Sequence, residues 1–389
     1  MKPISLKSAN SSSRREPFAA NYFFPFASAY AALILPWSIL AQLTLVPAPE
    51  ALLNSAGHAH EMLFGYALAV VAGYILGPQP QRLTLVLLGI WLTARITYLA
   101  APESLPAAGL NMLFAGLLTW RVVPRFTRAA KKWRNKAVAP LIIGLGLTVA
   151  LYHLAPYLAW PWLQHSLLFE AVLLLSGLMF FMGGRMIAPA IAGHLLKSGR
   201  DLEARVQPRI EGAVLILGAL ALILQIVPID SFRQLAGGLL ILIAGMTIVR
   251  IYRWQIWHAL NRPDLLSLTI GYVWLAIGWL LVGTSLLTSR ISLTSALHAI
   301  TIGALGTLTL TVMARTRLQR TRRDPNSVPV IYLAVGLVSL ATLLRMAAGT
   351  ALPALPTYLS AAVCWSLAYG ILFLVLIREG WKEREKRVP

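Results

Sequence analysis

Long apolar runs separated by short basic segments account for most of this sequence of 389 residues. A membrane-spanning helix needs about 20 mostly apolar residues, because each residue rises about 1.5 Å along the helix axis. By this measure the sequence predicts an all-α polytopic membrane protein with about twelve transmembrane helices, which form a single domain over residues 22–377. The predicted spans are residues 22–46, 58–78, 82–101, 105–124, 138–159, 163–187, 209–228, 232–251, 264–288, 292–314, 328–350 and 354–377.

Composition supports a membrane protein rather than a soluble domain. Apolar residues make up 58% of the chain and charged residues 12%, against about 25% charged residues in soluble domains. The formal net charge is +20, but the basic residues fall in short blocks between the apolar runs. This pattern favours membrane lipids over nucleic acid as the partner of the basic residues. The one cysteine, Cys364, supports neither a disulfide framework nor a thiolate metal site.

Basic residues alternate between the two ends of the predicted spans. Blocks such as Arg121–Lys136, Arg185–Arg209 and Arg250–Arg262 fall in every second connection, whereas the connections between them are nearly free of Lys and Arg. Cytoplasmic loops of membrane proteins are enriched in Lys and Arg. We therefore expect both termini to be cytoplasmic, with polar tails at residues 1–21 and 378–389. The first span is too long for a signal-peptide core, so we expect it to be retained.

The predicted topology places most of the histidines near the outer surface of the membrane. Five of the seven histidines and four charged residues fall in the outer third of the membrane or at its interface. An ionisable group in a membrane is costly, so it indicates a functional site unless it contacts water. The histidines are His58, His60, His153, His165 and His298, and the charged residues are Glu61, Glu170, Arg95 and Arg345.

The stretch 57–66 contains two of these histidines and a carboxylate. If residues 58–61 are helical, His58 and Glu61 share a face and His60 points nearly the opposite way. If the chain is still extended there, both imidazoles point the same way and could hold one copper, zinc or haem iron. A third alternative is that both histidines are interfacial residues in contact with water.

Two further stretches combine glycine with a histidine or an arginine. His298 is predicted to lie about 9 Å inside its span, where a buried imidazole needs a partner. Gly303 and Gly306 follow it, and they favour close helix packing, although they could also admit a flat macrocycle. Arg185 could pair with a carboxylate or a haem propionate, but a basic anchor at the cytoplasmic end of the span is the simpler interpretation. Pro189 is expected to end that helix.

The remaining polar residues are weaker candidates. Glu170 is expected to be a proton-relay or ion-pair residue, with Arg95 or Arg345 as its partner. Two of the histidines are expected to be interfacial, and one tyrosine is expected to belong to helix packing or to an aromatic belt at the membrane surface. These three residues are His153, His165 and Tyr272.

Four stretches of the sequence resemble the NnrS family. They occur in the order and spacing of that family, and the resemblance extends from Phe24 to about Leu376. The first and the last stretch are too specific for a chance agreement. The four are His-Ala-His-Glu-Met-Leu-Phe-Gly-Tyr at 58–66, Gly-Gly-Arg-Met-Ile at 183–187, Gly-Tyr-Val-Trp-Leu-Ala-Ile-Gly at 271–278 and His-Ala-Ile-Thr-Ile-Gly-Ala-Leu-Gly-Thr-Leu-Thr-Leu at 298–310.

This resemblance implies a bacterial inner-membrane protein with twelve spans that is associated with haem and copper. It also implies a role in the response to nitric oxide and nitrosative stress, without a defined enzymatic reaction. On this analogy His58, His60 and His298 are the expected haem or copper ligands at an outer site that binds nitric oxide. Glu61 and Arg185 are the expected supporting residues.

The sequence departs from the family pattern on the predicted cytoplasmic side. Thr269 stands where the family usually has a histidine, and Arg320 replaces a second one within residues 319–323. Residues 77–81 replace a Pro-Asn-Trp segment. The resemblance therefore supports an outer metal site and not an inner one. The alternative is a metal-free carrier or scaffold that uses the outer polar residues for proton-coupled or anion binding.

Overall fold

The structure is a computed structural model, and it describes residues 17–128, 136–226, 229–321 and 323–385. Every long element in these ranges is a helix, so the predicted all-α fold is confirmed. The uninterrupted long helices are α1 Ala20–Gln42, α4 Gln81–Ala100, α5 Leu105–Arg128, α7 Val138–Leu154, α8 Leu163–Lys197, α9 Pro208–Ile226, α10 Asp230–Arg253, α11 Pro263–Thr288, α14 Val330–Ala347 and α15 Ala354–Glu385.

Two more long helices contain a π-helical segment, in which the backbone N–H bonds to the carbonyl five residues earlier. One consists of α2 Ser55–His60, the π segment Glu61–Ala67 and α3 Leu68–Ile75. The other consists of α12 Leu293–His298, the π segment Ala299–Ala304 and α13 Leu305–Arg320. Each π segment begins directly after a histidine, and π-helical turns are frequent at functional sites.

The helices have the length and composition of membrane spans. Among the described residues, ten helices are long and apolar enough to cross a membrane. The two predicted spans outside this set coincide with the interrupted helix α2–α3 and with α7, which has 17 residues. The protein is therefore a multi-pass membrane protein, whereas the number of twelve crossings stays a prediction.

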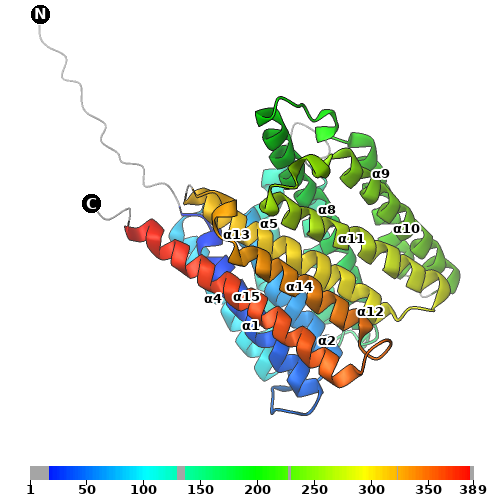
Figure 1. The fold of residues 1–389 in the computed structure, drawn as a ribbon. Coiled ribbons are helices and arrows are strands. Elements are labelled where there is room, and N and C mark those ends of the chain that lie inside the picture. Colours follow the sequence, from blue (N-terminus) through cyan, green and yellow to red (C-terminus); the bar gives the residue numbers. More distant parts are fainter. Residues whose placement is uncertain (1–16, 129–135, 227–228, 322, 386–389) are drawn as a thin grey trace, which may run out of the picture.

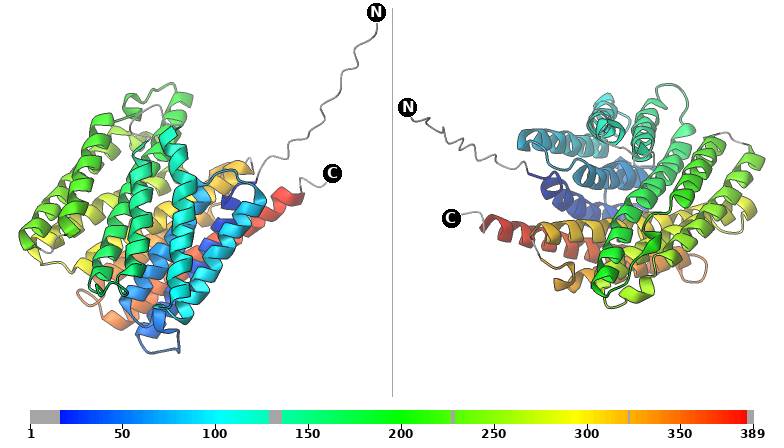
Figure 2. Two further views of the ribbon diagram at one scale, coloured as in Figure 1. Left: turned by 180° about the vertical axis from the view of Figure 1, so that it is seen from behind. Right: turned by 90° about the horizontal axis from the view of Figure 1, so that it is seen from above.

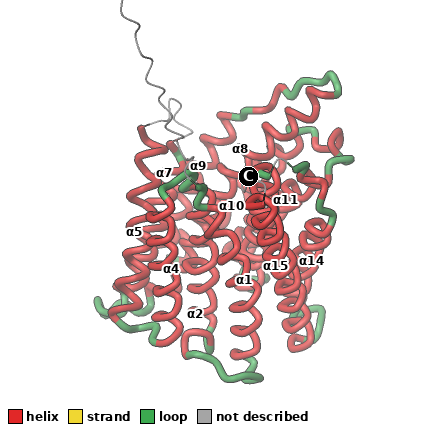
Figure 3. The backbone as a smooth tube through the Cα atoms, turned by 90° about the vertical axis from the view of Figure 1, so that its left-hand side faces the viewer, coloured by secondary structure: helices red, strands yellow, loops and turns green. Residues whose placement is uncertain are grey.

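The helices lie side by side, and the connections between them gather at the two ends of the bundle (Figures 1 and 3). The first and last helices, α1 and α15, are neighbours, and the indole of Trp365 on α15 donates to the carbonyl of Ala31 on α1 at 3.0 Å. Helices α9 and α10 lie at the opposite edge of the bundle (Figures 1 and 2). The chain ends thus close one side of the bundle.

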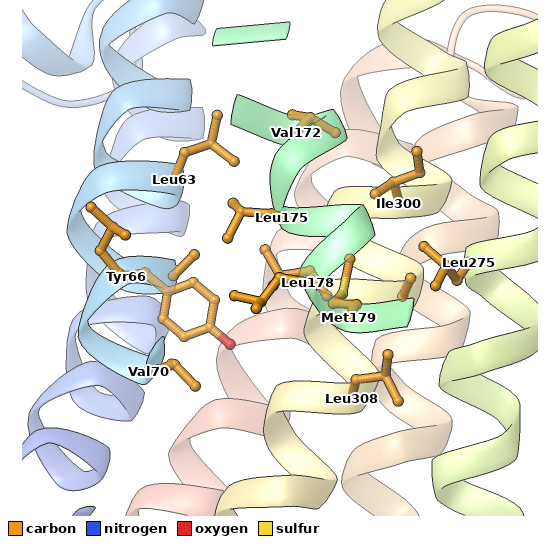
Figure 4. Close-up of a cluster of buried hydrophobic side chains, with 14 of the residues drawn as sticks. Leu63, Tyr66, Val70, Val172, Leu175, Leu178, Met179, Leu275, Ile300 and Leu308 are labelled. Carbon is orange, nitrogen blue, oxygen red and sulfur yellow. The ribbon is translucent and has the colours of Figure 1, made fainter. Parts of the chain in front are cut away.

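Helix α8 is the most buried of the spans. In its most apolar window 83% of the residues are buried, against 17% for the span Glu203–Ile226 at the edge. Figure 4 shows Val172, Leu175 and Met179 of α8 between the α2–α3 helix and the α12–α13 helix. The apolar core of the bundle therefore joins the two helices that carry a π segment.

Glycines allow these helices to pack closely. A Cβ atom added to Gly73 would lie 2.7 Å from the ring of Phe24, and one added to Gly303 would lie 2.9 Å from the indole of Trp274. At Gly306 the nearest atom, in Trp365, would be 2.7 Å away. Protein side chains occupy the space beside Gly303 and Gly306, so the predicted helix packing is confirmed and a macrocycle does not lie there.

Two predicted boundaries are wrong. Pro189 does not end its helix, because α8 continues to Lys197. The flanking residues Ile187 and Ile191 are fully buried, and packing on both sides of the proline sustains the helix. The segment after residue 377 is also helical, since α15 continues to Glu385. Lys, Arg and Glu favour helices, and charge alone does not end one.

Candidate functional site

The predicted outer residues gather at one end of the bundle, where α2 and α12 begin; we call it the histidine end (Figure 1). All of them except Glu170 belong to one of two separate groups. One group lines a cavity, which we call the histidine cavity, and the other forms a network of hydrogen bonds, which we call the buried network. The first group contains His58, His165, His298 and Arg345, and the second contains Tyr30, His60, Glu61, Arg95, Asn111 and His153.

The histidine cavity has a volume of about 370 Å³ and is lined by residues of α1, α2, α8, α12, α14 and α15 and of the two π segments. Most of its wall is apolar. Binding cavities for organic ligands and cofactors have volumes of about 300–1,000 Å³ and mostly apolar walls with a few polar groups. The apolar wall includes Leu35, Met62, Phe169, Val172, Leu297 and Trp365.

His58 and His298 each have one ring nitrogen in a hydrogen bond. His298 Nδ1 donates to the carbonyl of Thr294, one helical turn earlier, at 2.5 Å. His58 Nδ1 is 3.1 Å from the hydroxyl of Ser38 on α1. A hydrogen bond at Nδ1 fixes the orientation of the ring and, where Nδ1 is the donor, leaves Nε2 as the basic nitrogen. The two side chains therefore offer Nε2 atoms from two different helices to one cavity.

Arg345 supplies the positive charge of the cavity. Its guanidinium lies 4.7 Å from the ring centre of Tyr358, which also lines the cavity. His165 is exposed and lies at the edge of the cavity, as expected of an interfacial residue. Among the described residues of the lining there is no Asp or Glu. The polar side of the cavity thus suits a ligand with a negative charge.

The buried network surrounds Glu61, whose side chain is fully buried. Its Oε1 atom accepts from Arg95 Nη1 at 2.7 Å and from His60 Nδ1 at 2.8 Å. Its Oε2 atom accepts from the hydroxyl of Tyr30, and Arg95 also donates to the side chain of Asn111. Because Glu61 accepts at His60 Nδ1, the Nε2 atom of His60 carries the lone pair.

That Nε2 atom meets a histidine from another helix. His153, on α7, places its own Nε2 atom 3.1 Å from His60 Nε2. The two rings are almost perpendicular, at 87°, and Tyr98 stacks on His60 with 3.5 Å between ring centres. The His153 side chain is 4% exposed, whereas its predicted position at the membrane interface stays a prediction. It is a buried partner of His60.

The structure decides between the alternatives for residues 57–66. Residues 55–60 are helical, so His58 and Glu61 both contact α1, while His60 points toward α7. This is the arrangement expected of a helix. The extended alternative, in which His58 and His60 hold one ion together, is therefore wrong.

Glu170 does not pair as predicted. Arg95 pairs with Glu61, and Arg345 lies over Tyr358. The Glu170 side chain is buried, and its Oε1 atom has no hydrogen-bond partner among the described residues. Among the described residues no ion pair joins Glu170 to either arginine, so neither predicted pair forms.

The opposite end of the bundle carries arginines and their counter-ions. Arg185 lies there on α8 with its Nη1 atom 3.9 Å from the sulfur of Met182. Tyr272 packs on Trp254 and donates to the carbonyl of Phe180 at 2.8 Å. The two positions where the family resemblance implies histidines have other roles. Thr269 donates to its own helix at 2.9 Å, and Arg320 lies over the ring of Phe18.

Several residues of the site were not identified in the sequence. Asn111 could have been found, since it is an uncharged polar residue inside a predicted span, and such residues need partners. Tyr66 lines the histidine cavity, and its hydroxyl group lies 2.5 Å from the hydroxyl group of Thr309. It also forms a hydrogen bond with the hydroxyl group of Tyr369. Figure 4 shows the Tyr66 side chain pointing into the bundle. Tyrosines in spans are too common for this cluster to be predicted.

The side chains that could act as ligands can be compared with what the cofactors implied by the family resemblance need. Among the described residues, no group of three or more His, Cys, Asp or Glu side chains converges on one point. A site that needs three such protein ligands is therefore not present in that part of the chain. Haem needs only one or two axial ligands, an apolar cavity and a cation for its propionates. The histidine cavity offers all three, so its residues fit haem.

Apolar helices and a cavity lined by imidazole and guanidinium groups define a multi-pass membrane protein with a partly polar cavity in its helix bundle. The family model described as NnrS protein matches residues 16–384. The chain therefore belongs to the NnrS family, whose members are membrane proteins related to nitric oxide. A search of curated proteins finds no match to this chain.

Proposed function

We propose that this protein binds haem in the histidine cavity and handles nitric oxide there, at the outer side of the bacterial inner membrane. The observation that carries the proposal is the pair His58 and His298, which present Nε2 atoms from two helices to one apolar cavity of about 370 Å³. The topology that puts the histidine end outside follows from the basic residues at the opposite end.

The side chains of the cavity have separate tasks. Ser38 and the Thr294 carbonyl hold the two imidazoles in place, and Arg345 would receive the propionate groups. Apolar residues such as Phe169 and Trp365 exclude water from the rest of the cavity. Bound haem would supply an iron atom that binds nitric oxide. The protein would then sense, store or remove nitric oxide that dissolves in the membrane.

A visible spectrum of the purified protein tests this proposal. We expect a Soret band that shifts when nitric oxide is added to the dithionite-reduced protein. His58→Ala and His298→Ala should each remove or shift the band, whereas His194→Ala at the opposite end should leave it unchanged. A protein that stays colourless after haem supplementation would contradict the proposal. So would a Soret band that is the same in both cavity variants as in the wild type.

A second candidate function has its own observation. The polar lining of the cavity combines Arg345 with three histidines, and no Asp or Glu occurs among its described residues. Such a cavity could bind an anion without any metal, as in a metal-free carrier. Colour separates the two candidates, because a haem protein absorbs visible light and a metal-free carrier does not. A colourless protein whose anion binding is lost in Arg345→Gln would support the carrier.

A further inference from the structure

We propose that a second cavity binds nitric oxide as a dissolved gas next to the histidine cavity, an inference that rests on the proposed function. This cavity has a volume of about 80 Å³ and is lined by residues of α3, α8 and α13 and of the first π segment. Three methionines of α8, spaced three and four residues apart, share the helix face that lines it. We call it the methionine cavity, after Met179, Met182 and Met186.

The wall of the methionine cavity suits an apolar ligand. None of its described residues is charged. Figure 4 shows Val70 of α3 on one side and Leu178 and Met179 of α8 on the other. Methionine side chains are flexible and polarisable, so they adapt to a small apolar ligand. The other apolar residues of the wall are Ala67, Val71, Ile75, Leu175, Leu305, Leu308 and Val312.

The methionine cavity offers few hydrogen-bond partners to water. A buried water molecule usually makes two to four hydrogen bonds to polar groups. Among the described residues of the wall, only Tyr74 and Thr309 carry a hydroxyl group. Thr309 donates to the carbonyl of Leu305 at 2.6 Å, and its oxygen also contacts the hydroxyl group of Tyr66. Apolar cavities of this kind stay dry and take up apolar ligands such as xenon.

The size of the methionine cavity favours a diatomic gas. Such a molecule is close in size to water, which occupies about 30 Å³ in the liquid. A cavity of about 80 Å³ therefore has room for it and is too small for haem. Nitric oxide is uncharged and only weakly polar, so it enters apolar surroundings without the large desolvation cost of an ion.

Only a thin partition separates the methionine cavity from the histidine cavity. Leu305 lines both cavities. Tyr66 lines the histidine cavity, and its hydroxyl group lies 2.5 Å from that of Thr309, which lines the methionine cavity. This hydrogen bond holds two of the side chains in place, whereas the apolar side chain of Leu305 can change its rotamer. Nitric oxide released in the histidine cavity would pass Leu305 and remain close to the haem.

Crystals of the purified full-length protein under xenon pressure test the gas site without haem. Xenon is an apolar atom that scatters X-rays strongly, and it should give a peak in the methionine cavity. Val70→Phe should remove the peak, because the larger side chain fills the space. Val86→Phe is the control, since Val86 is 57% exposed on α4, and it should keep the peak.

The wild-type crystals decide the proposal even if Val70→Phe does not fold. A methionine cavity without xenon, or one that holds water or a detergent chain instead, would overturn it. A xenon peak that persists unchanged in Val70→Phe would also overturn it. Xenon in a protein that stays colourless would support the gas site and contradict the haem proposal, whereas a Soret band without a xenon site would do the reverse.

Rebinding of nitric oxide after a laser flash tests the passage past Leu305. In the reduced, haem-loaded protein we expect a fast phase from the histidine cavity and a slower phase from the methionine cavity. Val70→Phe should lose the slower phase, and Leu305→Ala should accelerate it because the partition is opened. Rebinding that is the same in both variants as in the wild type would overturn the proposal.

Discussion

At the scale of single residues, Glu61 connects most of the polar groups of the buried network. It accepts hydrogen bonds from Tyr30, His60 and Arg95, and its side chain is fully buried. Three hydrogen-bond donors offset the free-energy cost of burying a carboxylate inside a membrane protein. Each of the three donors would lose its hydrogen-bond acceptor without Glu61. The loss would cost most at Arg95, because its side chain is charged and the residue is only 2% exposed.

We predict that Glu61→Leu lowers the stability of the protein by about 3–5 kcal/mol, because it leaves the Arg95 charge buried and unpaired. The double variant Glu61→Leu with Arg95→Leu should lose less, since it removes both charges together. Thermal unfolding in detergent, followed by circular dichroism, measures both. The prediction fails if the double variant is the less stable of the two.

At the scale of helices, close contacts between backbones hold α10 against α11. A Cβ atom added to Gly237 on α10 would lie 2.7 Å from the carbonyl oxygen of Gly283 on α11, and one added to Gly283 would lie 2.6 Å from the carbonyl oxygen of Gly237. A backbone oxygen cannot rotate away as a side chain can. The neighbouring Gly238 has no atom within 4 Å of such a Cβ.

These two adjacent glycines give a matched pair of variants. Gly237→Ala should force α10 and α11 apart and reduce stability by about 1–3 kcal/mol, the usual cost of overpacking. Gly238→Ala should be neutral or stabilising by up to about 1 kcal/mol, because alanine favours the helix. Melting temperatures of the two variants in detergent test this difference. Equal melting temperatures would show that the contact at Gly237 does not limit packing.

The sequence predicted the helices well, but it predicted the side-chain contacts between helices less well. Apolar runs and the alternation of basic blocks located twelve helical segments, because burial in a membrane imposes length and hydrophobicity on each helix separately. The division of the histidines into two sites depends on which helices are neighbours and how each is rotated. His153 could not be assigned to His60 from the sequence, since 93 residues separate them. The same reason explains the wrong partners predicted for Glu170.

At the scale of the whole molecule, the two ends of the bundle differ in charge. Five of the seven histidines and the buried Glu61–Arg95 pair lie at the histidine end. Ion pairs lie at the opposite end, where Arg250 contacts Glu211 at 2.8 Å and Arg323 contacts Glu379 at 2.5 Å. Basic residues remain on the cytoplasmic side during insertion. The orientation of the bundle therefore decides whether the histidine cavity faces the outside of the cell membrane.

Cysteine labelling in a Cys364→Ser background tests this orientation. Thr350 lies exposed in the connection between α14 and α15 at the histidine end, and Ser198 lies exposed after α8 at the opposite end. In spheroplasts, a membrane-impermeant thiol reagent should label the Thr350→Cys variant, whereas the Ser198→Cys variant should react only after permeabilisation. The reverse pattern would place the histidine cavity on the cytoplasmic side. The part of the proposed function that puts nitric oxide binding at the outer side of the membrane would then be wrong.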